Sequence, residues 1–291
     1  MRKRETQMTS TNSTISGTDA TPILVIGGTG KTGRRIVGRL TDRNIPVRVG
    51  SRSAEIPFDW EDQSTWGPAL QDVKSAYISY APDIAIPGTV PKIEALVKLA
   101  AENGVRHLVL LSGRGEEEAE LAEAVVQNSG LDWTIIRCSW FSQNFSENYL
   151  LEPILAGELV LPAGSTPEPY IDADDIADVA VAALTEAGHV GQLYELTGPR
   201  MLTFTEVARE LSAAIGRPIT YTEIPHEAYV AELKQYGLPD DVIWLIDYLF
   251  ATVLDGRNAY LTDGVQRALG REPRDFAEYA RDTAATGVWN V

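Results

Sequence analysis

The chain has 291 residues, with 25 basic and 41 acidic side chains and a formal net charge of −16. This strong negative charge argues against binding to nucleic acid or to an anionic membrane surface. A single cysteine, Cys138, excludes an intramolecular disulfide, three scattered histidines give no metal-ligand spacing, and no apolar run reaches the roughly 18 residues of a membrane helix.

Residues 1–21 are rich in Ser, Thr, Asn and Asp, and no apolar stretch follows the basic start Arg2-Lys3-Arg4. This composition predicts a disordered tail rather than a secretory signal, and so a cytoplasmic protein.

From residue 22 onward, short apolar strands alternate with helices. The predicted strands are 23–26, 47–49, 76–80, 107–111 and 133–136, and the predicted helices are 34–40, 90–102 and 116–128. This rhythm predicts an α/β fold with a Rossmann-type, doubly wound parallel sheet over residues 22–155. The triple glutamate that opens the helix at 116–128 is typical of an acidic first helical turn, which the helix dipole favours.

Residues 156–291 break this rhythm and predict a smaller C-terminal α/β portion that binds substrate. We expect helices at 172–184 and 203–216 and strands at 192–196 and 219–222, with about 185–198 returning to the Rossmann sheet. A helix that opens at Pro239 is apolar nearly all round, which favours a fully buried helix over a lid.

The turn between the first strand and the first helix carries the strongest chemical signal. Gly27, Gly30 and Gly33 are spaced three residues apart, with Thr29, Lys31 and Thr32 between them. Glycine permits a tight turn, and the helix N-terminus attracts a pyrophosphate. In this strand–turn–helix context the pattern predicts a dinucleotide site, and the alternative is a glycine turn without a ligand.

The end of the second strand indicates which dinucleotide is bound. It reads Ser51-Arg52-Ser53 and lacks the acid with which NAD enzymes bind the ribose hydroxyls. A guanidinium and two hydroxyls suit a 2′-phosphate, and Lys31 adds charge, so we expect NADP(H). The alternative is that Arg52 is only a solvated loop residue.

Further candidates follow the later strands, where ligands of doubly wound sheets lie. Asp59 accepts from the adenine amino group or closes a turn, and Tyr80, Ala81 and Pro82 lie beside the reactive half of the cofactor. Beyond the strand at 133–136 we expect an aromatic wall with two amides that contacts a flat substrate; the alternative places its aromatic residues in the core. Its residues are Trp140, Phe141, Gln143 and Asn144.

Three stretches resemble the NmrA-like branch of atypical short-chain dehydrogenases: residues 26–33, 130–137 and 140–145, with support from 170–177 and 196–199. The resemblance covers about residues 22–290. Residues 58–60 with Trp66, and residues 140–147, look closest to festuclavine (ergot-alkaloid) dehydrogenase-like members, which reduce an iminium carbon with NADPH. Other relatives reduce quinones or azo compounds, and still others are redox-sensing regulators.

Extended members of this superfamily carry a Tyr-x-x-x-Lys pair on the helix that here spans 116–128, and this helix has neither residue. Carbonyl reduction needs an acid at the developing alkoxide, whereas hydride addition to an iminium gives a neutral amine. Ser112 matches the superfamily's serine and either hydrogen-bonds substrate or caps the strand end. Tyr80 is the one phenol placed near the nicotinamide, although packing or cofactor contact suits it better than catalysis.

The sequence therefore predicts an NADPH-dependent oxidoreductase that transfers hydride to a small, flat imine, iminium or conjugated substrate and uses no metal. The alternative is a non-catalytic NAD(P)-sensing regulator that acts through a protein partner. The sequence leaves a homo-oligomer open.

Overall fold

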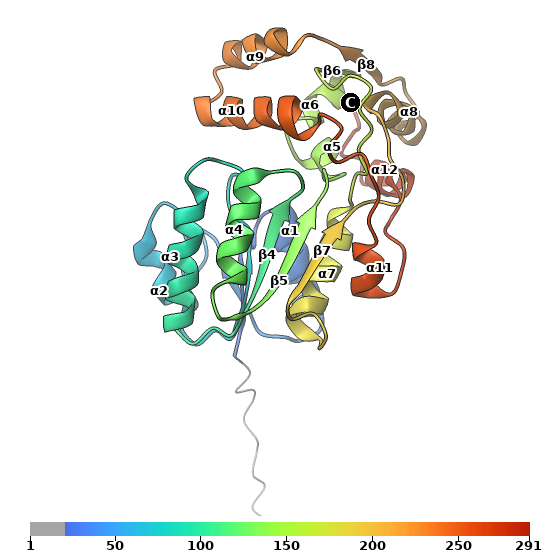
Figure 1. Ribbon diagram of the computed structural model, residues 1–291. Helices are drawn as coiled ribbons and strands as arrows, with labels where there is room; N and C mark the ends of the chain where they lie inside the picture. Colours follow the sequence, from blue (N-terminus) through green and yellow to red (C-terminus); the bar gives the residue numbers. More distant parts are fainter. Residues whose placement is uncertain (1–20) are drawn as a thin grey trace, which may run out of the picture.

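A six-stranded, wholly parallel sheet forms the centre of the molecule, as seen in the computed structural model, which describes residues 21–291 (Figure 1). The predicted tail, apart from Thr21, lies outside the described residues. The strands, in their order across the sheet, are β2 (Val47–Gly50), β1 (Ile23–Ile26), β3 (Ser75–Ile78), β4 (His107–Gly113), β5 (Asp132–Cys138) and β7 (Gln192–Leu196). The predicted Rossmann-type α/β fold is confirmed.

Helices cover both faces of this sheet, which explains why β1 is a continuous apolar run. Leu24 and Ile26 face the layer of α2, α3 and α4, whereas Ile23 and Val25 face the layer of α1, α7 and α11. The first layer comprises α2 (Trp66–Leu70), preceded by the short η1 (Gln63–Thr65), α3 (Thr89–Glu102) and α4 (Glu117–Gln127). The second comprises α1 (Lys31–Asp42), α7 (Ala173–Thr185) and α11 (Gly264–Leu269).

The remaining elements form a smaller lobe with its own core, beyond the carboxyl ends of the strands (Figure 1). They are α5 (Asn144–Glu147), α6 (Leu151–Ala156), β6 (Glu158–Leu161), α8 (Phe204–Ile215), β8 (Thr220–Glu223), α9 (His226–Gln235), α10 (Asp240–Tyr248), its π-helical continuation η2 (Leu249–Val253) and α12 (Phe276–Ala285). β6 and β8 pair in parallel as a separate two-stranded sheet. A capping box between Thr203 and Glu206 begins α8, within the helix expected at 203–216.

The helix expected from Pro239 is α10 with η2, but the prediction that it is buried all round is wrong. Ile243 and Ile246 pack into the core of the smaller lobe, whereas Trp244 is exposed and stacks on Tyr248 with ring centroids 5.1 Å apart. One side of the helix therefore packs on the lobe core, and Figure 1 shows the helix on the side of this lobe that faces α4.

Arg114, in the loop after β4, ties the C-terminal segment to the sheet. Its side chain is 1% exposed, and its Nε donates to Glu195 Oε1 of β7 at 2.6 Å. Its terminal nitrogens donate to the backbone oxygens of Asn258 and Tyr260, each at 3.3 Å, and its guanidinium lies over the Tyr260 ring. A buried guanidinium that is satisfied in this way fixes the segment that follows η2.

Candidate functional site

The turn after β1 has the shape that its glycines predict. Gly27 has a backbone φ of +75°, which residues with a side chain rarely adopt. A Cβ at Gly33 would overlap the carbonyl oxygen of Gly27, so only glycine lets α1 approach the turn this closely. The backbone therefore lies open to a ligand at the N-terminus of α1.

No side chain caps this helix: its N-cap residue is Gly30, and the first-turn amides have no intrahelical acceptor. Thr29 and Gly30 are exposed beside them. Thr32 differs from the others, because its hydroxyl is buried and accepts a hydrogen bond from Tyr77 at 2.8 Å. Uncapped amides at the positive end of a helix fit a pyrophosphate.

Lys31 opens α1 and lies close to two acids. Its ammonium donates to Asn144 Oδ1 at 2.8 Å, which brings a predicted cofactor residue and a predicted substrate residue together. Burial lowers the pKa of Lys31 to about 8, against the opposing charges of Glu147 and Asp83. This lysine can therefore gain or lose its proton near neutral pH, and an anionic ligand would favour the charged form.

Ser51, Arg52 and Ser53 follow β2 as expected. The two hydroxyl oxygens are 3.5 Å apart, and the exposed Arg52 guanidinium has no hydrogen bond or ion pair to any described residue. A guanidinium that is free in this way can be used wholly for an anionic ligand.

Asp59 and Tyr80 have structural contacts. Asp59 Oδ1 accepts a hydrogen bond from the backbone N–H of Glu61 at 3.0 Å. This contact closes a turn, which was the alternative to adenine binding for this residue. The Tyr80 ring packs on Trp60 with centroids 4.6 Å apart. Ala81 and Pro82, which follow it through a cis peptide bond, are exposed at the carboxyl edge of the sheet.

Two residues of the expected substrate wall instead belong to the interior. Trp140 is 8% exposed and packs edge-on against Phe204 and Phe250 in the core of the smaller lobe. Gln143 is buried at the N-terminus of α7, where its Nε2 donates to Asp172 and its Oε1 accepts from the backbone N–H of Ala173, both at 2.7 Å. The prediction that these two side chains line a substrate pocket is therefore not supported by their contacts.

Phe141 and Asn144 remain partly exposed. Phe141 packs against the core that α1 and α7 share with the sheet, and Asn144 holds Lys31. Of the four expected wall residues, Asn144 is the one whose side chain hydrogen-bonds a predicted cofactor-binding residue within the described chain.

Ser112 has a contact that the sequence did not suggest. Its hydroxyl is buried and donates to Glu123 Oε1 of α4 at 2.5 Å. Glu123 also binds the Arg137 guanidinium, with Nε and Oε1 2.8 Å apart. This arrangement links β4, α4 and β5, and it points the hydroxyl toward α4 rather than toward a ligand.

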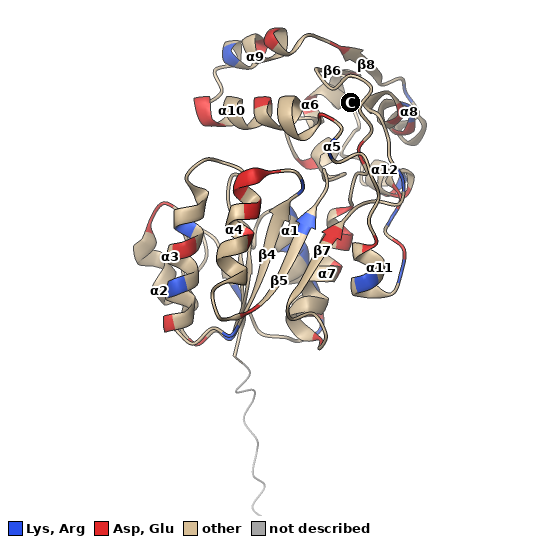
Figure 2. Ribbon diagram, in the orientation of Figure 1, with Lys and Arg blue, Asp and Glu red and all other residues tan. Residues whose placement is uncertain are grey.

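Glu116 is a candidate that sequence reasoning missed. The sequence predicts only an acidic first helical turn here, but Glu116 is the N-cap residue of α4 and is 8% exposed. Figure 2 shows acidic residues (red) at this end of α4, which faces α10 of the smaller lobe. Burial raises the pKa of the Tyr248 phenol of α10, and Glu116 is among the acids near enough to act on it. In the sequence, the one signal for a role of Glu116 at the site is its position shortly after the end of a strand.

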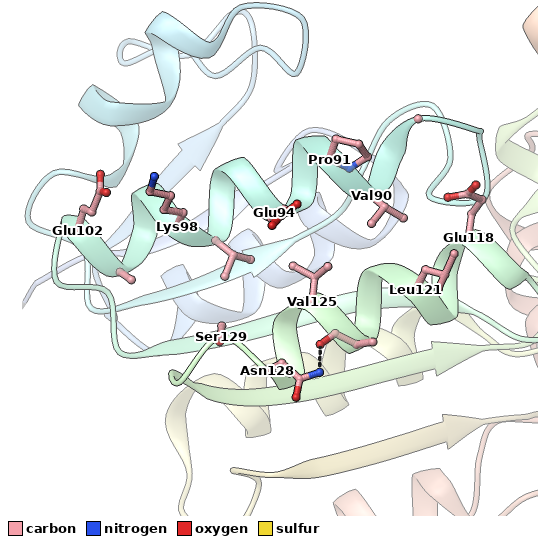
Figure 3. A pocket seen from close by; sticks show the side chains of 14 residues that line it. Val90, Pro91, Glu94, Lys98, Glu102, Glu118, Leu121, Val125, Asn128 and Ser129 are labelled. Carbon is pink, nitrogen blue, oxygen red and sulfur yellow. Dashed lines mark hydrogen bonds between the residues drawn. The ribbon is translucent and has the colours of Figure 1, made fainter.

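A groove of about 1010 Å³ lies elsewhere, between α3 and α4. Figure 3 shows Val90 of α3 and Leu121 and Val125 of α4 pointing into it. None of the predicted cofactor or substrate residues lines this groove. Within residues 21–291, no group of three or more His, Cys, Asp or Glu side chains could hold a metal ion. In the same part of the chain, no helix combines the length and the apolar character of a membrane span.

Comparison with known proteins gives the same assignment as the glycine turn. The NAD(P)H-binding family matches residues 27–187. The NAD(P)H azoreductase of Xenophilus azovorans is 33% identical over 90% of this chain and 98% of its own. The agroclavine dehydrogenase of Claviceps fusiformis is 29% identical over 92% of this chain and 98% of its own.

A solved structure shares the fold. It is an NADPH-dependent quinone oxidoreductase of Escherichia coli complexed with NADPH, with a TM-score of 0.74, 23% identity, and coverage of 89% of this chain and 99% of that one. The resemblance drawn from the sequence, to NmrA-like short-chain dehydrogenases with festuclavine dehydrogenase-like members, is confirmed.

Proposed function

This chain belongs to the NAD(P)H-binding family of oxidoreductases, and on that premise we propose that it is an NADPH-dependent reductase of small, flat, conjugated or iminium substrates. The observation that carries the choice of NADPH is the free Arg52 guanidinium beside Ser51 and Ser53, where NAD enzymes place an acid. NADPH supplies the hydride, and the protein binds and orients it.

The chain's own residues fit the dinucleotide. The uncapped amides of α1 bind the pyrophosphate, with room provided by Gly27 and Gly33. Lys31 adds a positive charge at the start of this helix, and Arg52 binds the 2′-phosphate at the end of β2.

We place the substrate at the carboxyl edge of the sheet, where the loop after β4 approaches α10. α4 presents neither Tyr nor Lys, which favours acceptors that take hydride readily, such as iminium ions and conjugated systems. Of the two relatives described above, one is named as a reductase and the other as a dehydrogenase.

The test is a calorimetric titration of the purified chain with NADPH, NADP⁺, NADH and NAD⁺, followed by NADPH oxidation assays with imines, quinones and azo compounds. We expect selective NADPH binding and oxidation by at least one acceptor class. Absence of dinucleotide binding would refute the proposal. Tight binding that is indifferent to redox state, without turnover, would support the non-catalytic sensor instead.

A further inference from the structure

Glu116 combines burial with an unused hydrogen-bonding atom. The residue is 8% exposed, and its Oε2 has no hydrogen-bond partner among the described residues. Its carboxyl lies against Gly113 at the end of β4, where a Cβ would overlap it. Buried carboxyl oxygens normally have partners, so an acid left without one at a ligand-binding edge of a sheet calls for a functional reason.

Burial and the groups around Glu116 favour its protonated form. Burial, then the negative charges of Asp83 in the β3–α3 loop and Glu123 of α4, raise its pKa well above the usual value. Cys138 of β5 and Tyr248 of α10 also lie within its electrostatic reach, and burial raises the pKa of both, so they stay neutral. Glu123 is bound to Ser112 and Arg137.

The neighbours of Glu116 connect it to the dinucleotide turn. Asp83, whose charge acts on Glu116, also acts on Lys31 at the start of α1. Lys31, Asp83 and Glu116 follow β1, β3 and β4, which are adjacent in the sheet. The acid therefore lies at the same edge as the glycine turn, two strands away from it.

We propose that Glu116 donates the proton that a neutral acceptor needs when it receives hydride, in the place of the missing tyrosine. This inference rests on the proposed function and names quinones among its conjugated substrates. Hydride from NADPH brings two electrons and one hydrogen to the quinone, the Glu116 O–H bond breaks as its proton passes to the resulting oxyanion, and the product is a hydroquinone. The Glu116 carboxylate regains a proton from water, and NADP⁺ leaves.

The discriminating experiment compares two acceptors that differ in their need for a proton. A benzoquinone needs one, and a cyclic N-methyl iminium salt does not. We expect Glu116→Gln to lower kcat with the quinone by about 100-fold, the usual scale for loss of a general acid. The iminium rate and the Kd for NADPH should change less than about twofold, because neither involves this proton. Glu117→Gln, an exposed neighbour on α4, is the matched control and should leave both rates unchanged.

Two further measurements separate proton donation from a structural role. The wild-type quinone rate should fall as pH rises through the pKa of Glu116, and Glu116→Gln should lose this dependence. Independently of turnover, infrared difference spectra of the NADPH-free protein should show a protonated buried carboxyl near neutral pH that Glu116→Gln lacks. Absence of that carboxyl signal overturns the proposal.

The remaining outcomes are also decisive. An equal fall with both acceptors, or an unchanged quinone rate, overturns the role of Glu116, as does a wild-type protein that reduces the iminium but not the quinone. If the wild type binds NADPH but reduces neither acceptor, the proposed function itself fails. Should Glu116→Gln not fold, the wild-type solvent deuterium isotope effect decides: a larger effect with quinone than with iminium is expected, and equal effects overturn the proposal.

Discussion

Replacement of Arg52 by alanine tests the cofactor assignment at one side chain. The guanidinium is exposed and has no hydrogen bond or ion pair to any described residue, so its removal leaves no internal group unsatisfied. The free energy of unfolding should therefore change by less than about 0.5 kcal/mol. Whatever Arg52 contributes should appear in ligand binding.

The size of the effect follows from the chemistry of the contact. Hydrogen bonds to a charged group contribute about 1.5–3 kcal/mol, and about 1.4 kcal/mol corresponds to tenfold in affinity. Because Arg52 is exposed, salt screens the contact, and the lower part of that range applies at physiological ionic strength. We expect Arg52→Ala to weaken NADPH binding by about 10- to 30-fold at about 0.15 M salt, and by more at lower salt.

The assay is calorimetric titration of NADPH and NADH into the wild type, Arg52→Ala and the control Arg43→Ala. Arg43 is another exposed arginine, at the far end of α1, where it pairs weakly with Glu186 at 3.7 Å. NADH lacks the 2′-phosphate, so its affinity should change less than about twofold in both variants. Equal weakening of NADPH and NADH, or no change in either, would refute the assignment of Arg52 to the phosphate.

Three other perturbations have defined outcomes. Because burial lowers the pKa of Lys31 to about 8, its charge is lost as pH rises past 8. NADPH should therefore bind more weakly above this pH, and the protein should take up as much as one proton when NADPH binds. Titrations at pH near 8.5 in buffers of different ionisation enthalpy measure this uptake, and Lys31→Met should abolish it. Gly33→Ala places a methyl group against backbone and should lower the free energy of unfolding by about 1–3 kcal/mol and weaken NADPH binding, as read by urea denaturation and titration. Arg114→Met leaves the backbone oxygens of Asn258 and Tyr260 without their buried donor and should cost about 1–3 kcal/mol in urea denaturation. Arg106→Met, at an exposed position, should cost less than about 0.5 kcal/mol.

The Rossmann part of the fold could be predicted because its signals are local. The apolar run at 23–26 and the glycines after it specify strand, turn and helix within a dozen residues, and the structure has all three. The capping box that begins at Thr203 is equally local. The short helices α5, α6 and α11 and the strand β6 were not predicted, because four to six residues carry too little periodic pattern.

The sequence predicted where in the fold the candidate site lies, but it did not predict the directions in which the side chains point. Trp140 and Gln143 do follow β5, as expected, yet partners distant in the sequence turn them inward: Phe250 for the tryptophan and Asp172 for the glutamine. Glu116 resembles any acidic helix start, and its burial depends on elements far from it in the chain. Side-chain direction depends on these long-range contacts, which a motif does not contain.

The return of β7 to the sheet also constrains how the protein is made. Residues 192–196 complete the edge beside β5, and α7 packs on α1 more than a hundred residues away in sequence. During synthesis, the dinucleotide-binding half therefore leaves the ribosome with β5 unpaired on one side and with α1 lacking its partner helix. A nascent chain that ends near residue 155 would expose this apolar strand edge, and it becomes safe from mispairing only when about forty further residues have emerged.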